Sequence, residues 1–257
     1  MTILQAIILG IVEGLTEFLP ISSTAHLIIT SDLLRIPSSD FLKTFEISIQ
    51  LGAILAVVVL YWKKIWSSWS LIWKIGAAFI PTAILGLIFY KIIKTYLMDN
   101  LIVIASALLL GGVILIVFEK YYKPKEDKED DLKTITYPQA IIIGLFQSLA
   151  MIPGVSRAAA TIIGGLSLGI RRKTIVEFSF LLAIPTMLAA TVLDVYKTPL
   201  TLTNQEILVW SIGFILSFIT AIIGVKFLIK FIQKNNFIPF GWYRIVLGGA
   251  VLLWVLI

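Results

Sequence analysis

The sequence predicts an all-α polytopic membrane protein, an inverted-topology repeat with six transmembrane helices plus two re-entrant helical hairpins meeting near the membrane centre. Three observations support this fold class: the apolar composition, a repeat within the chain and the distribution of basic residues. Hydrophobic residues make up 59% of the chain and charged residues 14%, whereas ordinary soluble domains are about 25% charged. The chain has no cysteine, which excludes disulfides and thiolate metal sites.

Apolar runs account for the six predicted transmembrane helices, and tryptophan or tyrosine often lies near their ends. The runs cover roughly residues 45–62, 76–90, 101–118, 178–193, 207–225 and 245–257. Another apolar stretch begins the chain, but it lacks a basic n-region, and a polar cluster follows where a small-residue cleavage site would be expected. We therefore do not interpret it as a cleaved signal peptide.

The chain contains two related halves. The segment "QAIILGIVEGLTEFLPISS", from Gln5, matches "QAIIIGLFQSLAMIPGVSR", from Gln139, at an offset of 134. Further matching groups follow in the same order, at offsets between 130 and 138. Each half has one polar segment interrupted by proline and then three apolar spans. We therefore predict one membrane domain over residues 1–257, with repeat one at 1–118, a charged linker at 119–134 and repeat two at 135–257.

The distribution of lysine and arginine tests whether the polar segments cross the membrane. If each segment enters and returns on the same side, one side of the membrane receives 15 basic residues, including Arg244, and the other receives 5. If the segments cross, the split is 11 to 9. Cytoplasmic loops carry an excess of basic residues, so the re-entrant arrangement is favoured. It places both termini outside the cytoplasm and brings the two hairpins toward a common centre from opposite faces.

The first polar segment, "EGLTEFLPISSTAH" at residues 13–26, contains the only histidine in the chain. Ionisable side chains at membrane depth are costly and commonly functional. Glu13 and Glu17 share a helix face, where their carboxylates repel unless a cation or an arginine lies between them. Together they can hold a divalent cation, Mg²⁺ or Ca²⁺, with water and phosphate oxygens completing the shell. The other candidates in this segment are Ser22, Ser23, Thr24 and His26.

The matching segment of repeat two, "PGVSR", carries different chemistry. The halves have diverged where chemistry would occur: Glu13 aligns with Gln147, Glu17 with Met151 and Ser23 with Arg157. Arg157 offers a planar guanidinium suited to phosphate, and Ser156 with the following amides can form a helix N-terminus that favours anions. An acid pair, a serine, a histidine and an arginine together indicate phosphoryl chemistry. Gln50 is a further candidate for the site.

Structural roles are the alternatives for these residues. The hydroxyl residues after Pro20 could simply cap a helix, and Arg157 could form an ion pair with one of the two glutamates. A lone histidine is more often structural than catalytic. The single histidine and two membrane-embedded acids nevertheless fall within 14 residues of each other, and this concentration favours a functional site.

The two motifs, "EGLTEFLPISSTAH" and "PGVSR" followed by a threonine, resemble those of the undecaprenyl-diphosphate phosphatases, the bacitracin-resistance family, and the resemblance covers essentially the whole chain. It implies hydrolysis of undecaprenyl diphosphate to the monophosphate lipid carrier of cell-wall synthesis, aided by Mg²⁺ or Ca²⁺, in the bacterial plasma membrane. Family members commonly read Ser-Arg-Ser-Gly before the threonine, whereas this chain reads "SRAAAT". The roles implied by the resemblance are Glu13 and Glu17 as the acidic pair, Ser23 as nucleophile, His26 as acid/base, and Arg157, Ser156 and Thr161 as the phosphate-binding group.

Two mechanisms fit the same residues. Ser23 could attack the terminal phosphorus, with His26 or Glu17 managing protons, or water could attack directly. A different class of function is also left open, a lipid-phosphate flippase or an anion/proton-coupled transporter, because broken helices in inverted repeats occur in many secondary transporters. We expect membrane lipid and no nucleic acid among the partners, since basic cytoplasmic loops explain the net charge of +6. The sequence leaves a homodimer open.

Overall fold

The computed structural model describes residues 1–97, 100–123, 131–197 and 202–256, and within these residues every regular element is a helix. Six of the described helices are long and apolar enough to cross a membrane, and each contains one of the predicted apolar runs, residue 257 lying outside the described residues. This confirms the all-helical polytopic fold class. The six are α3 (Asp40–Trp66), α4 (Trp69–Ile92), α5 (Leu101–Tyr121), α8 (Arg172–Lys197), α9 (Asn204–Ile232) and α10 (Ile238–Leu256).

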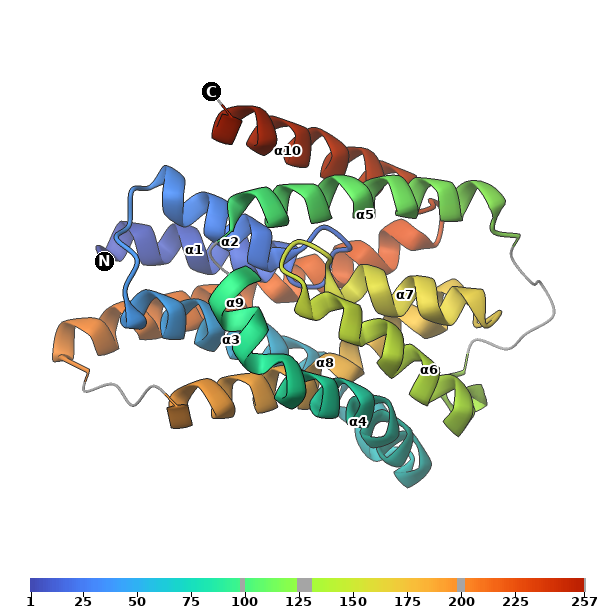
Figure 1. Cartoon of the computed structure of the whole chain (residues 1–257). Helices are drawn as coiled ribbons and strands as arrows, with labels where there is room; N and C mark the ends of the chain where they lie inside the picture. Colours follow the sequence, from blue (N-terminus) through green and yellow to red (C-terminus); the bar gives the residue numbers. More distant parts are fainter. Residues whose placement is uncertain (98–99, 124–130, 198–201, 257) are drawn as a thin grey trace.

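Two pairs of short helices stand at the start of the two halves. Hairpin 1 consists of α1 (Ile3–Thr16) and α2 (Ser23–Leu33), and hairpin 2 consists of α6 (Tyr137–Ser148), the 3₁₀ turn η3 (Leu149–Met151) and α7 (Arg157–Ser167). The longest of these α-helices has 14 residues and measures about 21 Å, less than the roughly 30 Å of a bilayer core. Figure 1 shows the two tips pointing toward each other in the middle of the molecule.

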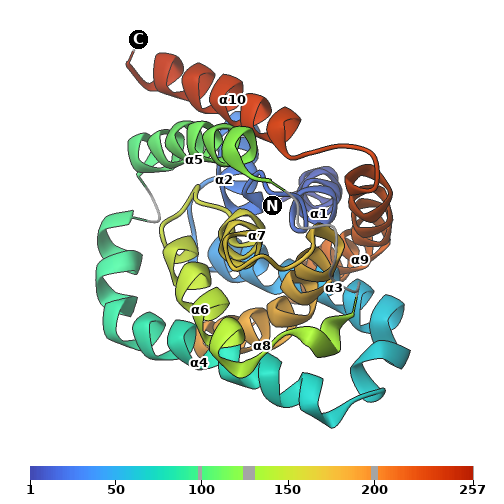
Figure 2. The same ribbon diagram turned by 90° about the vertical axis from the view of Figure 1, so that its right-hand side faces the viewer.

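The long helices surround the tips. Helix α1 packs on α9 and α6 on α4, while α5 packs on α10 and α3 on α8. Figure 2 shows α7 near the centre, with long helices around it. Buried aromatic side chains join the halves: Phe18, at the tip of hairpin 1, meets Phe180 of α8 edge-to-face at 5.2 Å between centroids. The element order is the same in both halves, as the repeat predicts, and the inverted orientation of the halves stays a prediction.

Two predictions about charged residues were wrong. Glu119 was assigned to the charged linker, yet α5 continues through it to Tyr121, and its buried carboxylate pairs with Arg172. Linker residues 124–130 lie outside the described residues. Arg244 was counted among the cytoplasmic charges, yet its side chain is fully buried. Backbone carbonyls inside the molecule accept its hydrogen bonds, which replaces the hydration that a loop would provide.

Candidate active site

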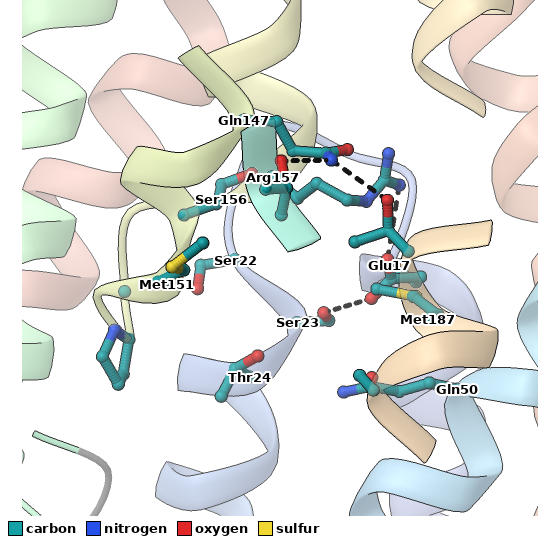
Figure 3. A pocket seen from close by; sticks show the side chains of 16 residues that line it. Glu17, Ser22, Ser23, Thr24, Gln50, Gln147, Met151, Ser156, Arg157 and Met187 are labelled. Atoms are coloured by element: carbon teal, nitrogen blue, oxygen red, sulfur yellow. Dashed lines mark hydrogen bonds and ion pairs between the residues drawn. The ribbon is translucent and has the colours of Figure 1, made fainter. Parts of the chain in front are cut away.

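A cavity of about 190 Å³ lies where the two hairpin tips meet (Figure 3). Both halves of the chain contribute to its wall. Hairpin 1 contributes four polar residues, all of them predicted from the sequence: Glu17, Ser22, Ser23 and Thr24. The rest of the wall consists of Gln50, Thr82, Gln147, Ala150, Met151, Pro153, Gly154, Ser156, Arg157, Thr186, Met187 and Ala190.

Equivalent serines end the two tips. Ser22 and Ser156 have φ angles of 71° and 72°, in the left-handed region that a residue with a Cβ seldom adopts. Each caps the helix that follows: Ser22 Oγ accepts a hydrogen bond from Ala25 N at 3.5 Å, and Ser156 Oγ accepts one from Ala159 N at 3.2 Å. The capping role predicted as an alternative is therefore real for Ser22, and it coexists with a place in the cavity wall. Helices α2 and α7 consequently begin at the cavity.

Glu17 connects the two tips. Its Oε2 accepts a hydrogen bond from Ser23 Oγ at 2.5 Å, and its Oε1 lies 3.4 Å from Arg157 Nη2 in an ion pair. Arg157 also donates from Nη1 to the carbonyl of Ser179 at 2.7 Å, whereas its buried Nε has no hydrogen-bond partner among the described residues. A carboxylate, a hydroxyl and a guanidinium thus adjoin one cavity, where the guanidinium can bind phosphate oxygens and the carboxylate can activate the hydroxyl.

Glu13 lies one helical turn before Glu17 and outside the cavity wall. Its side chain is fully buried, and both carboxylate oxygens lack hydrogen-bond partners among the described residues. An isolated buried carboxylate is costly, so these oxygens suit a cation. The described residues contain no group of three or more acidic, histidine or cysteine side chains arranged to hold a metal. A divalent cation on the two glutamates would therefore need water and phosphate oxygens as its remaining ligands.

Besides Glu13, two predicted site residues lie outside the cavity wall, His26 and Thr161. His26 is buried, with Nδ1 2.7 Å from the carbonyl oxygen of Ser22 and Nε2 2.7 Å from the hydroxyl of Tyr243, whose ring stacks on the imidazole. Both ring nitrogens are thus engaged outside the cavity. Thr161 lies behind Arg157: its Oγ1 is 2.7 Å from Ser179 Oγ and donates to the Arg157 carbonyl at 3.0 Å. In this geometry Thr161 orders the surroundings of the guanidinium.

A polar cluster that was not predicted from the sequence lies on the hairpin 2 side of the cavity. Gln147 Nε2 donates to Thr82 Oγ1 at 2.9 Å and to Thr186 Oγ1 at 3.0 Å, which ties α6 to α4 and α8 (Figure 3). Gln147 Oε1 is buried without a hydrogen-bond partner in the described part of the chain. The sequence did contain a signal for this cluster: each threonine directly follows a proline, Pro81 or Pro185, inside a long apolar helix.

The fold and this site define a class: a polytopic helical membrane protein with a cavity, lined in part by polar and charged side chains, between two hairpin tips. The chain matches the family described as "Bacitracin resistance protein BacA" over residues 6–250, and it belongs to that family. It is 51% identical to a protein of Wolinella succinogenes over 99% of both chains. It is 53% identical to one of Sulfurihydrogenibium sp., covering 99% of this chain and 100% of that one. A protein of Aquifex aeolicus is 52% identical over 96% of each chain. All three relatives are named undecaprenyl-diphosphatase.

Proposed function

We propose that the chain is an integral membrane phosphatase that hydrolyses undecaprenyl diphosphate to undecaprenyl phosphate and inorganic phosphate. The activity recycles the lipid carrier of cell-wall synthesis and confers bacitracin resistance. The observation that carries the proposal is the contact between the two tips, which brings the Ser23 hydroxyl, the Glu17 carboxylate and the Arg157 guanidinium together at one cavity. At about 190 Å³ the cavity is smaller than the roughly 300 Å³ or more of typical ligand sites, which suits a head group whose tail lies outside.

Arg157 binds the diphosphate. Its Nε has no hydrogen-bond partner among the described residues, and its Nη2 makes only a long contact to Glu17, so both can donate to a phosphate. A guanidinium can contact two phosphate oxygens at once. The N-termini of α2 and α7 begin at the same cavity and favour the anion. As Arg157 turns to the phosphate, Glu17 keeps its hydrogen bond to Ser23 and is placed to accept a proton.

Hydrolysis then proceeds at the terminal phosphorus. The Ser23 Oγ–phosphorus bond forms as the bond from phosphorus to the bridging oxygen breaks, undecaprenyl phosphate leaves, and the Oγ proton passes to Glu17 Oε2. Water then attacks the phosphoserine, which releases phosphate and restores the hydroxyl. Direct attack by water, with Glu17 as the base, uses the same residues. The observed geometry favours Glu17 over His26 as the proton acceptor, because Tyr243 and the Ser22 carbonyl occupy the two imidazole nitrogens.

A divalent cation, Mg²⁺ or Ca²⁺, is the proposed cofactor. Glu13 and Glu17 would hold it, and the unpartnered oxygens of Glu13 support this assignment. When bound, the cation neutralises negative charge on the phosphates. The chain's own contribution is the pair of carboxylates on one face of the first hairpin.

The surroundings of the protein follow from the same proposal. It lies in the bacterial cytoplasmic membrane with both termini outside, and the polyprenyl tail of the substrate lies in membrane lipid. The charge distribution supports this orientation, because 14 basic residues remain on the predicted cytoplasmic side once Arg244 is removed from the count. A homodimer would bury part of the apolar surface that the long helices otherwise present to lipid.

The test is phosphate release from a polyprenyl diphosphate by the purified protein in detergent. We expect release by the wild type, loss of about 100-fold or more in Glu17→Ala and Arg157→Ala, and loss with EDTA that Mg²⁺ or Ca²⁺ restores. Lys226→Ala removes an exposed charge on α9 and serves as the control. Absence of release by folded wild type with every cation and chain length would overturn the phosphatase and leave transport, which needs a membrane and a gradient.

A further inference from the structure

Arg244 joins both hairpin tips to the surrounding helices. It lies on α10, its side chain is fully buried, and each of its three nitrogens donates to main-chain carbonyls. Nε donates to Leu108 O at 3.3 Å, Nη1 to Pro20 O at 3.3 Å and Val155 O at 3.0 Å, and Nη2 to Ala107 O at 3.1 Å and Gly154 O at 2.9 Å. A guanidinium has five N–H groups, so these five bonds use every donor.

The position of these acceptors in the chain is informative. Pro20 lies in the tip of hairpin 1, three residues before Ser23, and Gly154 and Val155 lie in the tip of hairpin 2, just before Arg157. The other two acceptors belong to α5. One side chain therefore holds the main chain of both tips against a long helix. Its described hydrogen-bond partners are all carbonyl oxygens, so it is not one half of an ordinary ion pair.

A glycine on α5 leaves the space that the Arg244 side chain occupies. Gly111 of α5 faces the guanidinium, and a Cβ built at Gly111 would lie 2.0 Å from Arg244 Nη2 and 2.7 Å from Cζ. Any larger residue at position 111 would displace the guanidinium from its carbonyls. The glycine pair that the two repeats share at positions 111–112 and 248–249 thus has a specific use in repeat one, which the proposed chemistry does not explain.

We propose that Arg244 is a positioning residue that keeps the two tips in register while the substrate is bound. The inference rests on the proposed function. In the ligand-free geometry Glu17 and Arg157 already link the tips, but this 3.4 Å contact must loosen when Arg157 turns to a phosphate. The Arg244 hydrogen bonds involve no group that reacts, so they keep Ser23 at its place relative to Arg157 throughout the reaction.

Two substitutions test the link from opposite sides. Arg244→Lys keeps the charge but offers three donors from a single nitrogen. An ammonium group therefore cannot contact all five carbonyls that the planar guanidinium contacts. Gly111→Ala keeps Arg244 and pushes its guanidinium away. We expect kcat to fall about 10- to 100-fold in each, because misplacement of reacting groups by about 1 Å has effects of this size, with a smaller change in KM. Gly249→Ala on α10 is the matched control, since its Cβ would meet no atom within 4 Å.

Hydrogen exchange provides a readout that does not depend on activity. The main-chain amides of both tips, residues 18–24 and 152–158 apart from the two prolines, should exchange faster in Gly111→Ala and Arg244→Lys than in wild type and Gly249→Ala. Unchanged exchange in the tips and unchanged kcat in folded Gly111→Ala would overturn the proposal, even if Arg244→Lys fails to fold. If the tips exchange faster in the two variants but the wild-type protein shows no phosphatase activity, the proposed function is refuted and the structural role of Arg244 stands.

Discussion

At the scale of single residues, the site depends on Glu17, which faces both a hydroxyl and a guanidinium. The short contact from Ser23 Oγ to Glu17 Oε2, at 2.5 Å, orients the hydroxyl proton toward the carboxylate. The longer contact to Arg157 directs the other oxygen toward hairpin 2 until Arg157 turns to a phosphate. Glu17 is therefore held in one orientation before substrate arrives, and this preorganisation reduces the rearrangement needed in the transition state.

This geometry leads to a prediction about Ser23. If its hydroxyl is the nucleophile, Ser23→Ala should lower phosphate release at least about 100-fold, and Ser23→Thr should retain a measurable part of it. Acid quenching with substrate labelled in the terminal phosphate should trap label on the wild-type protein and none on Ser23→Ala. Full activity in Ser23→Ala would remove the serine from this role and leave direct attack by water.

The sequence predicted much of the site at this scale, because polar side chains stand out in an apolar chain. Glu17, Ser23 and Arg157 were all predicted, and the structure brings them together. Ser179 was not predicted, because a serine inside an apolar helix carries no sign of the carbonyl that it offers to Arg157. The contacts of His26 could not be predicted. The histidine itself is visible in the motif, but its partner Tyr243 lies 217 residues away in the chain.

At the scale of elements, the two tips share the same backbone conformation at equivalent serines. Each has a serine with positive φ that begins a helix at the cavity. The tip loops therefore pair a strained conformation with a capping hydrogen bond, and the bond to the helix offsets part of the strain. The sequence indicated a helix start after Pro20 and another at Ser156, and the structure has both. It did not indicate the positive φ of the two capping serines, because proline shows where a helix breaks but not the φ of the residue that caps the next one.

A substitution series at Ser156 should separate strain from capping. Ser156→Ala loses the cap and retains a Cβ at positive φ, so it should cost about 1 kcal/mol. Ser156→Gly loses the cap and relieves about 1–2 kcal/mol of strain, so its melting temperature in detergent should exceed that of the alanine variant by roughly 2–8 °C.

Thr203 provides the comparison for this series. It caps α9 with an ordinary φ of −75°, so glycine there gains nothing from released strain, and the difference between its glycine and alanine variants should be smaller. Equal differences at the two positions would show that the conformation of Ser156 is not strained in the folded protein.

At the scale of the whole molecule, the repeat determines where chemistry can occur. Two copies of one hairpin supply two tips, and their divergence gives one tip acids and hydroxyls and the other an arginine. The six long helices and the breaks between the short helices were predictable because apolar runs and their proline interruptions are local patterns. Arg244 was not, because counting charges by loop assumes that a basic residue at the end of an apolar run faces water. Only the packing of α10 on α5 reveals the carbonyls that surround it.

The orientation of hairpin 1 gives the last prediction. Gln5 Nε2, at the start of α1, donates to the carbonyl of Leu34, at the end of α2, at 3.3 Å. The two ends of the hairpin are therefore adjacent, and in a membrane they should reach the same face. The chain contains no cysteine, so single cysteines can be labelled without background.

We expect Thr2→Cys and Ser38→Cys, both exposed positions, to react with a membrane-impermeant maleimide added to intact cells. Ser67→Cys, exposed between α3 and α4, should react only after permeabilisation, because α3 carries the chain across the bilayer. Opposite behaviour of Thr2→Cys and Ser38→Cys would mean that the first polar segment crosses the membrane. The same side for both, but with Ser67→Cys alone labelled in intact cells, would keep the hairpin and reverse the proposed orientation of the protein. The two outcomes thus test the re-entrant hairpin and the charge-based orientation separately.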